Sequence, residues 1–112
     1  MRKFPVMLLL AAALPAWAAA QFVSAEDLYA GLASKDGQRR AYARGYVMAV
    51  VDVGASSTIH NRIFCVPREA KAEAVAEAVG AWFREHAKEL KHPAEELVAR
   101  ALEDSYHCGP KP

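Results

Sequence analysis

The sequence predicts an all-α protein: a small domain of four (or four to five) helices, stapled by one disulfide. Three observations lead to this fold class. Apolar residues recur at helical spacing in the second half of the chain, over residues 68–90 and 91–108. Charged residues fill the positions between them, as on the solvent face of an amphipathic helix. The chain of 112 residues also contains two cysteines, which suits a single cross-link.

Residues 1–20 are typical of a secretory signal peptide. They begin with positive charge, continue with an apolar stretch over 4–14 and end in a run of alanines over 18–20. The apolar stretch is shorter than the roughly 20 residues that a membrane-spanning helix needs. We therefore expect cleavage after the alanines, one mature domain over 21–112 in the periplasm, and no membrane association after cleavage.

The charge balance bears on the partners of the protein. The chain has 14 Lys and Arg against 13 Asp and Glu, and loss of the signal peptide leaves it close to neutral. A domain that binds nucleic acid usually carries an excess of basic residues. We therefore expect no nucleic acid among its partners.

The first predicted helix covers residues 24–34. Ser24 is its expected N-cap, and acidic residues follow in the first turn, where they suit the helix dipole. Leu28 and Leu32 are spaced to face inward together. A turn-forming stretch over 34–37 then separates this helix from the next.

The second predicted helix lies within residues 38–57 and is apolar on both faces, which is typical of a central helix. Its β-branched residues would also suit a strand, but the start of the segment favours a helix. Gly45 is expected to let another helix approach closely, since glycine is otherwise unfavourable there. One apolar stripe comprises Tyr42, Tyr46, Ala49, Val50 and Val53.

Residues 54–67 show no period and predict the longest loop, with Pro67 at or just before the third helix. The third helix covers 68–90, and the fourth covers 91–108 with Pro93 in its first helical position. The third helix has an inner stripe of Ala72, Val75, Ala76, Val79, Trp82, Phe83 and His86. The inner stripe of the fourth comprises Leu97, Val98, Ala101, Leu102 and Ser105.

Cys65 and Cys108 are the cysteine pair. In an exported small protein an even number of cysteines predicts a disulfide, here worth about 4 kcal/mol by loop-closure entropy. His60 and His107 lie near them, so a metal site is an alternative, although the spacing fits no zinc pattern. A catalytic Cys–His pair is the other alternative.

Asp52 is the single charged residue within the apolar part of the second helix. A buried carboxylate is unfavourable unless it is paired. We therefore expect Asp52 to be a buried polar residue with a structural partner among Arg40, Arg44 and Tyr106. A ligand contact or a catalytic acid is the alternative.

The sequence lacks the residue patterns of common active sites. The histidines form no zinc-binding helix motif, the paired serines have no nucleophile elbow, and there is no Gly-rich phosphate loop. We therefore expect no enzyme activity, no cofactor and no metal ion.

Several motifs together resemble a known family. They are "GYVMAVVDVGA", "FCVP", and a helix that continues into "AWFREHAKELKHPAEELVARALEDSYHC". In this order and spacing, with the two cysteines, the chain resembles the Rap/Tai immunity proteins of type VI secretion systems over about residues 28–108. The resemblance implies an all-helical periplasmic protein with a Cys65–Cys108 disulfide. It further implies a non-enzymatic inhibitor of a peptidoglycan amidase effector, and it allows for a homodimer.

An inhibitor of this kind would cover the active-site groove of its target with a protruding loop. Two segments are available, 56–64 and the step over 86–93, and the second is favoured because two helices brace it. The candidate contact residues are His86, Lys88, Glu89, Lys91 and His92. The alternative functions are an acid-stress chaperone of the periplasm and an orphan envelope protein with the same fold.

Overall fold

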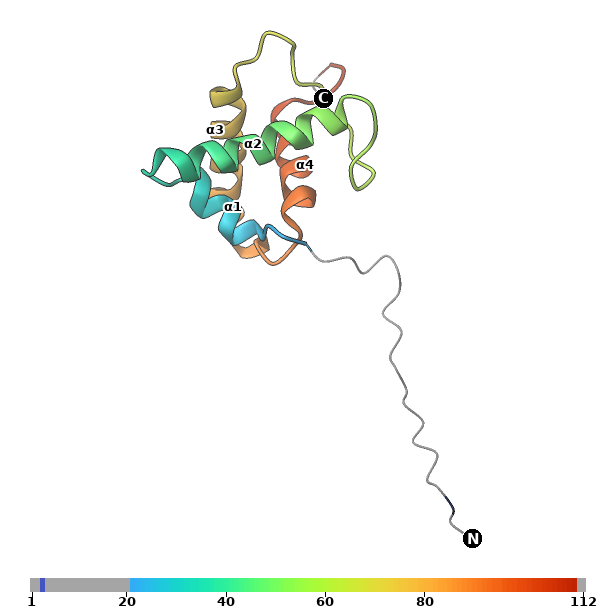
Figure 1. Ribbon diagram of the computed structural model, residues 1–112. Coiled ribbons are helices and arrows are strands. Elements are labelled where there is room, and N and C mark those ends of the chain that lie inside the picture. The colour runs from blue at the N-terminus through green and yellow to red at the C-terminus, as the bar shows by residue number, and fades with distance from the viewer. Residues whose placement is uncertain (1–2, 4–20, 111–112) are drawn as a thin grey trace.

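Four α-helices and a short 3₁₀ helix make up the fold (Figure 1). The computed structural model describes Lys3 and residues 21–110, so the predicted signal peptide lies outside it apart from Lys3. The helices are α1 (Ala25–Leu32), α2 (Gly37–Gly54), α3 (Ala72–Glu85), η1 (Ala87–Glu89) and α4 (Ala94–Ser105). The described residues contain no strand beyond one isolated bridge between Ile59 and Arg62. The predicted all-α fold class is confirmed.

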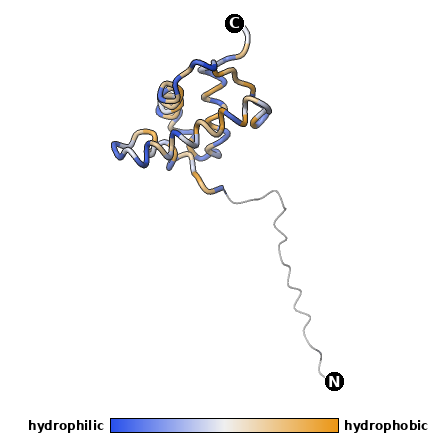
Figure 2. Tube along the Cα trace, turned by 45° about the horizontal axis from the view of Figure 1, so that its top comes forward, coloured by the Kyte–Doolittle hydropathy of each residue, from blue (hydrophilic) through white to orange (hydrophobic). Residues whose placement is uncertain are grey.

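The helix α2 runs across α3 and α4, which lie side by side, and α1 packs below the first half of α2 (Figure 1). Hydrophobic and hydrophilic residues are interspersed along the described chain (Figure 2), and each of the four α-helices has a face of buried, mainly apolar residues. These faces meet in one core to which all four helices contribute. Its largest fully buried side chains are Phe83, Leu28, Leu97, Leu102, Val47, Val75, Val79 and Val98.

Side chains cap the first two helices. The Ser24 hydroxyl accepts a hydrogen bond from the Asp27 amide (3.1 Å), which confirms the predicted N-cap of α1. A carboxylate oxygen of Asp36 accepts from the Gln38 amide (3.0 Å) at the start of α2. Each cap satisfies an amide that has no partner within its own helix, so the turn between α1 and α2 is fixed locally.

The ends of α3 and α4 differ from the prediction. The Ala70 amide donates to the Pro67 carbonyl (3.0 Å), which closes a turn and delays the start of α3 to Ala72. Pro93 caps α4 and does not occupy its first helical position. The predicted inner stripes of these two helices are buried, except for His86, which is partly buried, and for Ala72 and Ser105 at the helix ends, which are exposed.

The prediction that α2 is buried on both faces was wrong. Its buried residues are Ala43, Val47 and Val50, whereas Tyr42 is 69 % exposed and Val53 is 54 % exposed. The reason is geometric. The other helices pack against one side of α2, and its other side faces solvent (Figure 1).

The expectation that Asp52 is a buried polar residue is corrected by the same geometry. Asp52 lies on the exposed side of α2. Its carboxylate is hydrated there and needs no protein partner. Among the residues that the structure describes, no polar or charged residue is buried.

The close approach of another helix that was expected at Gly45 is found instead at Gly31 of α1, where an added Cβ would lie 2.9 Å from the Cβ of Ala43 in α2. Gly45 is exposed, and a Cβ added there would meet nothing within 4 Å. Gly54, at the end of α2, lies against the buried ring of Phe64, and a Cβ at that position would overlap the ring. The glycine thus lets the loop after α2 fold back over the end of that helix.

The predicted disulfide between Cys65 and Cys108 is present, with 5.0 Å between the two Cα atoms. The Cys65 amide also donates to the Tyr106 carbonyl (2.8 Å). The loop after α2 and the end of α4 are therefore joined by a covalent bond and by an adjacent backbone hydrogen bond.

Candidate partner-binding site

The connection between α3 and α4, residues 86–93, is a sequence of tight turns. α3 ends because the backbone of His86 leaves the helical region, at φ −116° and ψ 37°. The Glu89 amide then donates to the His86 carbonyl (2.9 Å), and the His92 amide donates to the Glu89 carbonyl (3.0 Å). These hydrogen bonds hold the backbone of the connection, so its side chains project from a fixed backbone conformation.

The side chain of Trp82 packs against the start of this connection. It is 6 % exposed, and its ring lies flat against that of His86, with 3.8 Å between centroids and 13° between planes. The indole Nε1 donates to the Asp104 carboxylate (2.7 Å), which ties α3 to α4. Nδ1 of His86 is 2.7 Å from the Trp82 carbonyl, which can only accept, so Nδ1 carries the hydrogen.

Arg100 completes the support from α4. Its guanidinium carbon lies 5.2 Å from the centre of the Trp82 ring, within range of a cation–π contact. Nη2 of Arg100 donates to both carboxylate oxygens of Glu89, each at 2.9 Å. This hydrogen bond, together with the positive charge of Arg100, lowers the pKa of Glu89, while partial burial opposes the shift. Glu89 is thus held as a carboxylate that anchors η1 to α4.

The structure brings the five predicted contact residues together in this one connection, but in two different roles. Lys88, Lys91 and His92 are exposed, and Nδ1 of His92 lies 4.0 Å from the Glu96 carboxylate. His86 and Glu89 are partly buried and hold the connection in place through the contacts just described. We call the exposed residues Lys88, Lys91 and His92 the cationic edge, because the two lysines are positively charged and the negative charge of Glu89 is paired with Arg100. Asp52 lies elsewhere, on the exposed side of α2.

The other predicted segment, residues 56–64, is held against α4 at two points. Nε2 of His60 lies 3.2 Å from the Glu95 carboxylate, and Arg62 donates to Glu103 (2.7 Å). His60 and Asn61 have positive φ values of 49° and 61°, which lets the chain reverse sharply between these anchors. This loop is therefore also a braced segment.

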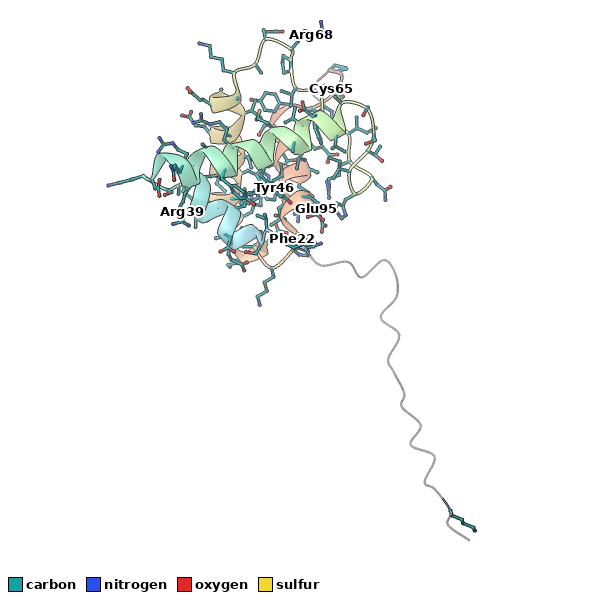
Figure 3. All side chains as sticks on the ribbon, viewed as in Figure 1. Phe22, Arg39, Tyr46, Cys65, Arg68 and Glu95 are labelled. Carbon is teal, nitrogen blue, oxygen red and sulfur yellow. A yellow bond between two sulfur atoms is a disulfide. The ribbon has the colours of Figure 1, made fainter. Side chains whose placement is uncertain are left out.

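Glu95 links this loop to α2, and Figure 3 labels both Glu95 and Tyr46 in the middle of the molecule. Burial raises the pKa of the Tyr46 hydroxyl, and the negative charge of Glu95 and a hydrogen bond with it raise the pKa further. Glu95 therefore lies close to a tyrosine of α2 and a histidine of the loop.

Exposed apolar side chains were not recognised from the sequence as surface residues. Ile63, in the braced loop, is 60 % exposed, and Tyr42 and Val53 lie on the open side of α2. Among these, exposed aromatic residues such as Tyr42 are frequent anchors in protein interfaces. The sequence shows that these residues are apolar, but an apolar residue is as typical of the core as of an exposed interface.

The described residues show no arrangement for metal binding. No three His, Cys, Asp or Glu side chains among them cluster closely enough to hold an ion, and Cys65 and Cys108 are bonded to each other. None of the helices in the described part is long and apolar enough to pass through a membrane.

The sequence profile of the Rap1a immunity proteins matches residues 19–108. This chain belongs to the Rap1a immunity protein family. The match covers all four helices, both braced segments and both cysteines. No curated protein and no solved structure matches the chain.

Family membership sets the class of function. A member of an immunity family acts by binding a cognate effector, so the exposed surfaces of the fold are where its function resides. The resemblance to Rap/Tai immunity proteins is thus confirmed at the level of the family.

Proposed function

We propose that this protein is a periplasmic immunity protein that binds and inhibits a peptidoglycan amidase effector delivered by a type VI secretion system. Membership in the Rap1a family supports the immunity role. The resemblance to Rap/Tai proteins supports the amidase as target and type VI secretion as the route. In this proposal the protein protects the cell that produces it and catalyses no reaction.

The disulfide and the start of the sequence support the periplasm as the site of action. Structural disulfides persist in oxidising compartments such as the periplasm and are rare in the cytosol. Cys65 and Cys108 form such a bond. The chain also begins with the charge, apolar stretch and small residues of a signal peptide. An effector that cleaves peptidoglycan would act in the same compartment.

The observation that carries the contact site is the bracing of the α3–α4 connection. Trp82, His86, Arg100 and Glu89 fix the backbone, while Lys88, Lys91 and His92 remain exposed. A pre-ordered segment loses little conformational entropy when it binds, so more of its contact energy appears as affinity. We propose that this cationic edge lies across the active-site groove of the amidase and blocks access of the peptidoglycan strand.

The first experiment is a pull-down with the purified, oxidised protein (residues 21–112) from periplasmic and secreted extracts, at neutral and at acid pH. The proposal expects one tight partner at neutral pH. That partner should hydrolyse peptidoglycan, and the hydrolysis should stop when the protein is added in equimolar amount. A partner without this activity, or one that remains active in the complex, would contradict the proposed function.

A matched pair of variants tests the contact site. Lys88→Glu together with Lys91→Glu reverses two charges of the exposed edge and should weaken binding roughly tenfold or more. Lys35→Glu together with Lys71→Glu makes the same change of charge at exposed positions away from this connection and should leave affinity within about twofold. Equal losses in the two variants would show that the α3–α4 connection is not the contact. Capture of many unfolded proteins at acid pH alone would instead support the chaperone.

A further inference from the structure

A groove of about 520 Å³ lies where the end of α1 and the start of α2 face α3, and none of residues 86–93 lines it. Its apolar lining includes Leu32 from α1 and Ala76, Gly80 and Ala81 from α3. The small residues of α3 keep the groove open, because a Cβ at Gly80 would already touch the Cβ of Leu32 at 3.9 Å. The floor is therefore apolar and rigid, formed by packed helices.

Three arginines line this groove. Arg40 and Arg44 lie one turn apart on α2, and Arg84 comes from α3. Arg40 donates to the Ser34 carbonyl through Nη1 (3.0 Å), and its other nitrogens remain available. Among the described residues, no acidic group lies within ion-pair distance of Arg40 or Arg84. Two carboxylates, Glu73 and Glu77, also line the groove, which leaves a net positive charge.

Arg44 is the most informative of the three. Its Nε is buried and has no hydrogen-bond partner. Its one ion pair is weak, because Nη1 lies 3.7 Å from Glu73, whose side chain is 72 % exposed. A buried N–H without an acceptor is unfavourable. The Arg44 side chain is 31 % exposed, so its terminal nitrogens can still donate to a carboxylate that enters the groove.

We propose that this groove binds an acidic segment of a partner protein. One carboxylate of the segment pairs with Arg44, a second lies between Arg40 and Arg84, and an aliphatic side chain covers Leu32 and Ala76. A nucleic acid fits less well, because Glu73 and Glu77 would repel a continuous row of phosphates. This inference does not depend on the proposed function, since the groove would bind such a segment whatever the partner does.

The test uses two synthetic pentapeptides, acetyl-GELEG-amide and its acetyl-GQLQG-amide counterpart, titrated into the oxidised protein. Nuclear magnetic resonance follows the arginine Nε–H signals and the methyl signals of Leu32 and Ala76. The acidic peptide should shift the signals of Arg44 and Arg84 in a saturable manner, and added salt should weaken the binding. The Gln peptide should bind at least about tenfold more weakly, because it offers no charged acceptor.

Variants separate this site from general charge attraction. Arg84 is exposed, so Arg84→Gln should leave the core intact and should reduce the affinity for the acidic peptide. The double variant, Arg44→Gln with Arg84→Gln, should reduce this affinity by about tenfold or more. Arg39→Gln with Arg68→Gln removes two exposed arginines outside the groove, labelled in Figure 3, and should leave affinity unchanged. The single exposed variant keeps the test valid if Arg44→Gln impairs folding.

Four outcomes would overturn the inference. The first is the absence of a saturable shift, and the second is an equal response to both peptides. The third is a loss of binding in the Arg39 and Arg68 variant that equals the loss in the groove variant. Shifts of the Arg44 signal that depend on protein concentration without peptide would assign the groove to a second copy of this chain, and would equally overturn the proposal.

Discussion

The imidazole of His86 lies parallel to the indole of Trp82, with ring centroids 3.8 Å apart, and both side chains belong to the last turn of α3 or its cap. The same histidine donates from Nδ1 to the Trp82 carbonyl (2.7 Å), which also accepts from the His86 backbone amide (3.0 Å). The backbone of His86 thus ends α3, and its side chain fastens the start of the α3–α4 connection to Trp82.

Removal of this side chain should destabilise the protein. His86→Ala loses a partly buried hydrogen bond and a ring stack, so we expect the free energy of unfolding to fall by about 1–2 kcal/mol. Urea unfolding followed by circular dichroism measures the change. His92→Ala, at an exposed position of the same connection, is the control and should stay within about 0.5 kcal/mol of the parent protein. Similar values for both variants would show that the stack contributes nothing particular.

The Glu89–Arg100 pair should make stability depend on pH in the acid range. Arg100 lowers the pKa of Glu89 below its ordinary value of 4.5. A carboxyl group with a lowered folded pKa stabilises the fold above its unfolded pKa, and this contribution disappears as pH falls through the folded pKa. We therefore expect Glu89→Gln to show a smaller loss of stability than the parent protein as the pH is lowered below 4.5.

Urea midpoints measured in steps from about pH 6 to pH 3 give the comparison, since carboxyl groups titrate in this range. Glu85→Gln, at an exposed position of α3, is the control and should follow the parent protein. A Glu89→Gln profile that parallels the parent profile throughout would contradict the role given to Arg100.

The pKa of the Tyr46 hydroxyl should depend on the neighbouring Glu95. Burial raises the pKa of its hydroxyl above 10.0, and Glu95 raises it further. In Glu95→Gln we expect the pKa of Tyr46 to move down toward 10.0 without reaching it, because burial still disfavours the phenolate. The ultraviolet absorbance of tyrosinate reports this titration. The matched control is Glu96→Gln, one residue further along α4, which should leave the Tyr46 titration in place.

A raised pKa also predicts the direction of alkaline stability. The stabilisation from neutral Tyr46 is complete below its unfolded pKa and is lost as pH rises through its folded pKa. Tyr46→Phe should therefore lose less stability than the parent protein above pH 10.0. A steeper loss in Tyr46→Phe would reverse the sign and contradict the raised pKa.

Two of the three glycines of α2, Gly45 and Gly54, should respond to alanine in opposite directions. Gly54→Ala places a methyl group against the buried Phe64 ring and should destabilise the protein by about 1–3 kcal/mol. Gly45→Ala, at an exposed helical position with open space around it, should stabilise by up to about 1 kcal/mol. Thermal unfolding of both variants checks the pair. A stabilising Gly54→Ala would mean that the loop after α2 does not pack closely in solution.

Helix periodicity was sufficient for α3 and α4. Val75, Val79 and Phe83 recur at the spacing of one helical face, charged residues fill the other face, and these three side chains are buried. In α2 the pattern failed, because apolar residues lie on both faces and sequence spacing does not show where the other helices pack. Asp52 and Val53 were assigned to the core on that ground, and both are exposed.

Only part of the candidate site could be predicted from the sequence. Pro93 and the polar residues before it located the α3–α4 connection. The contact of Arg100 with Glu89 and with Trp82 depends on how α3 and α4 pack, which no local motif encodes. The groove residues Arg44 and Arg84 lie far apart in the chain and meet through packing of α2 on α3. Such relationships require the three-dimensional structure.

The bond between Cys65 and Cys108 closes a covalent ring that contains all of α3, the α3–α4 connection and all of α4, while α1 and α2 lie outside it. A protease that cuts one peptide bond anywhere in residues 66–107 opens the ring without releasing a fragment. The nicked chain would remain one molecule, separable into two pieces only after reduction. The segment proposed to meet the effector is therefore also the segment at which a single cut leaves the chain in one piece.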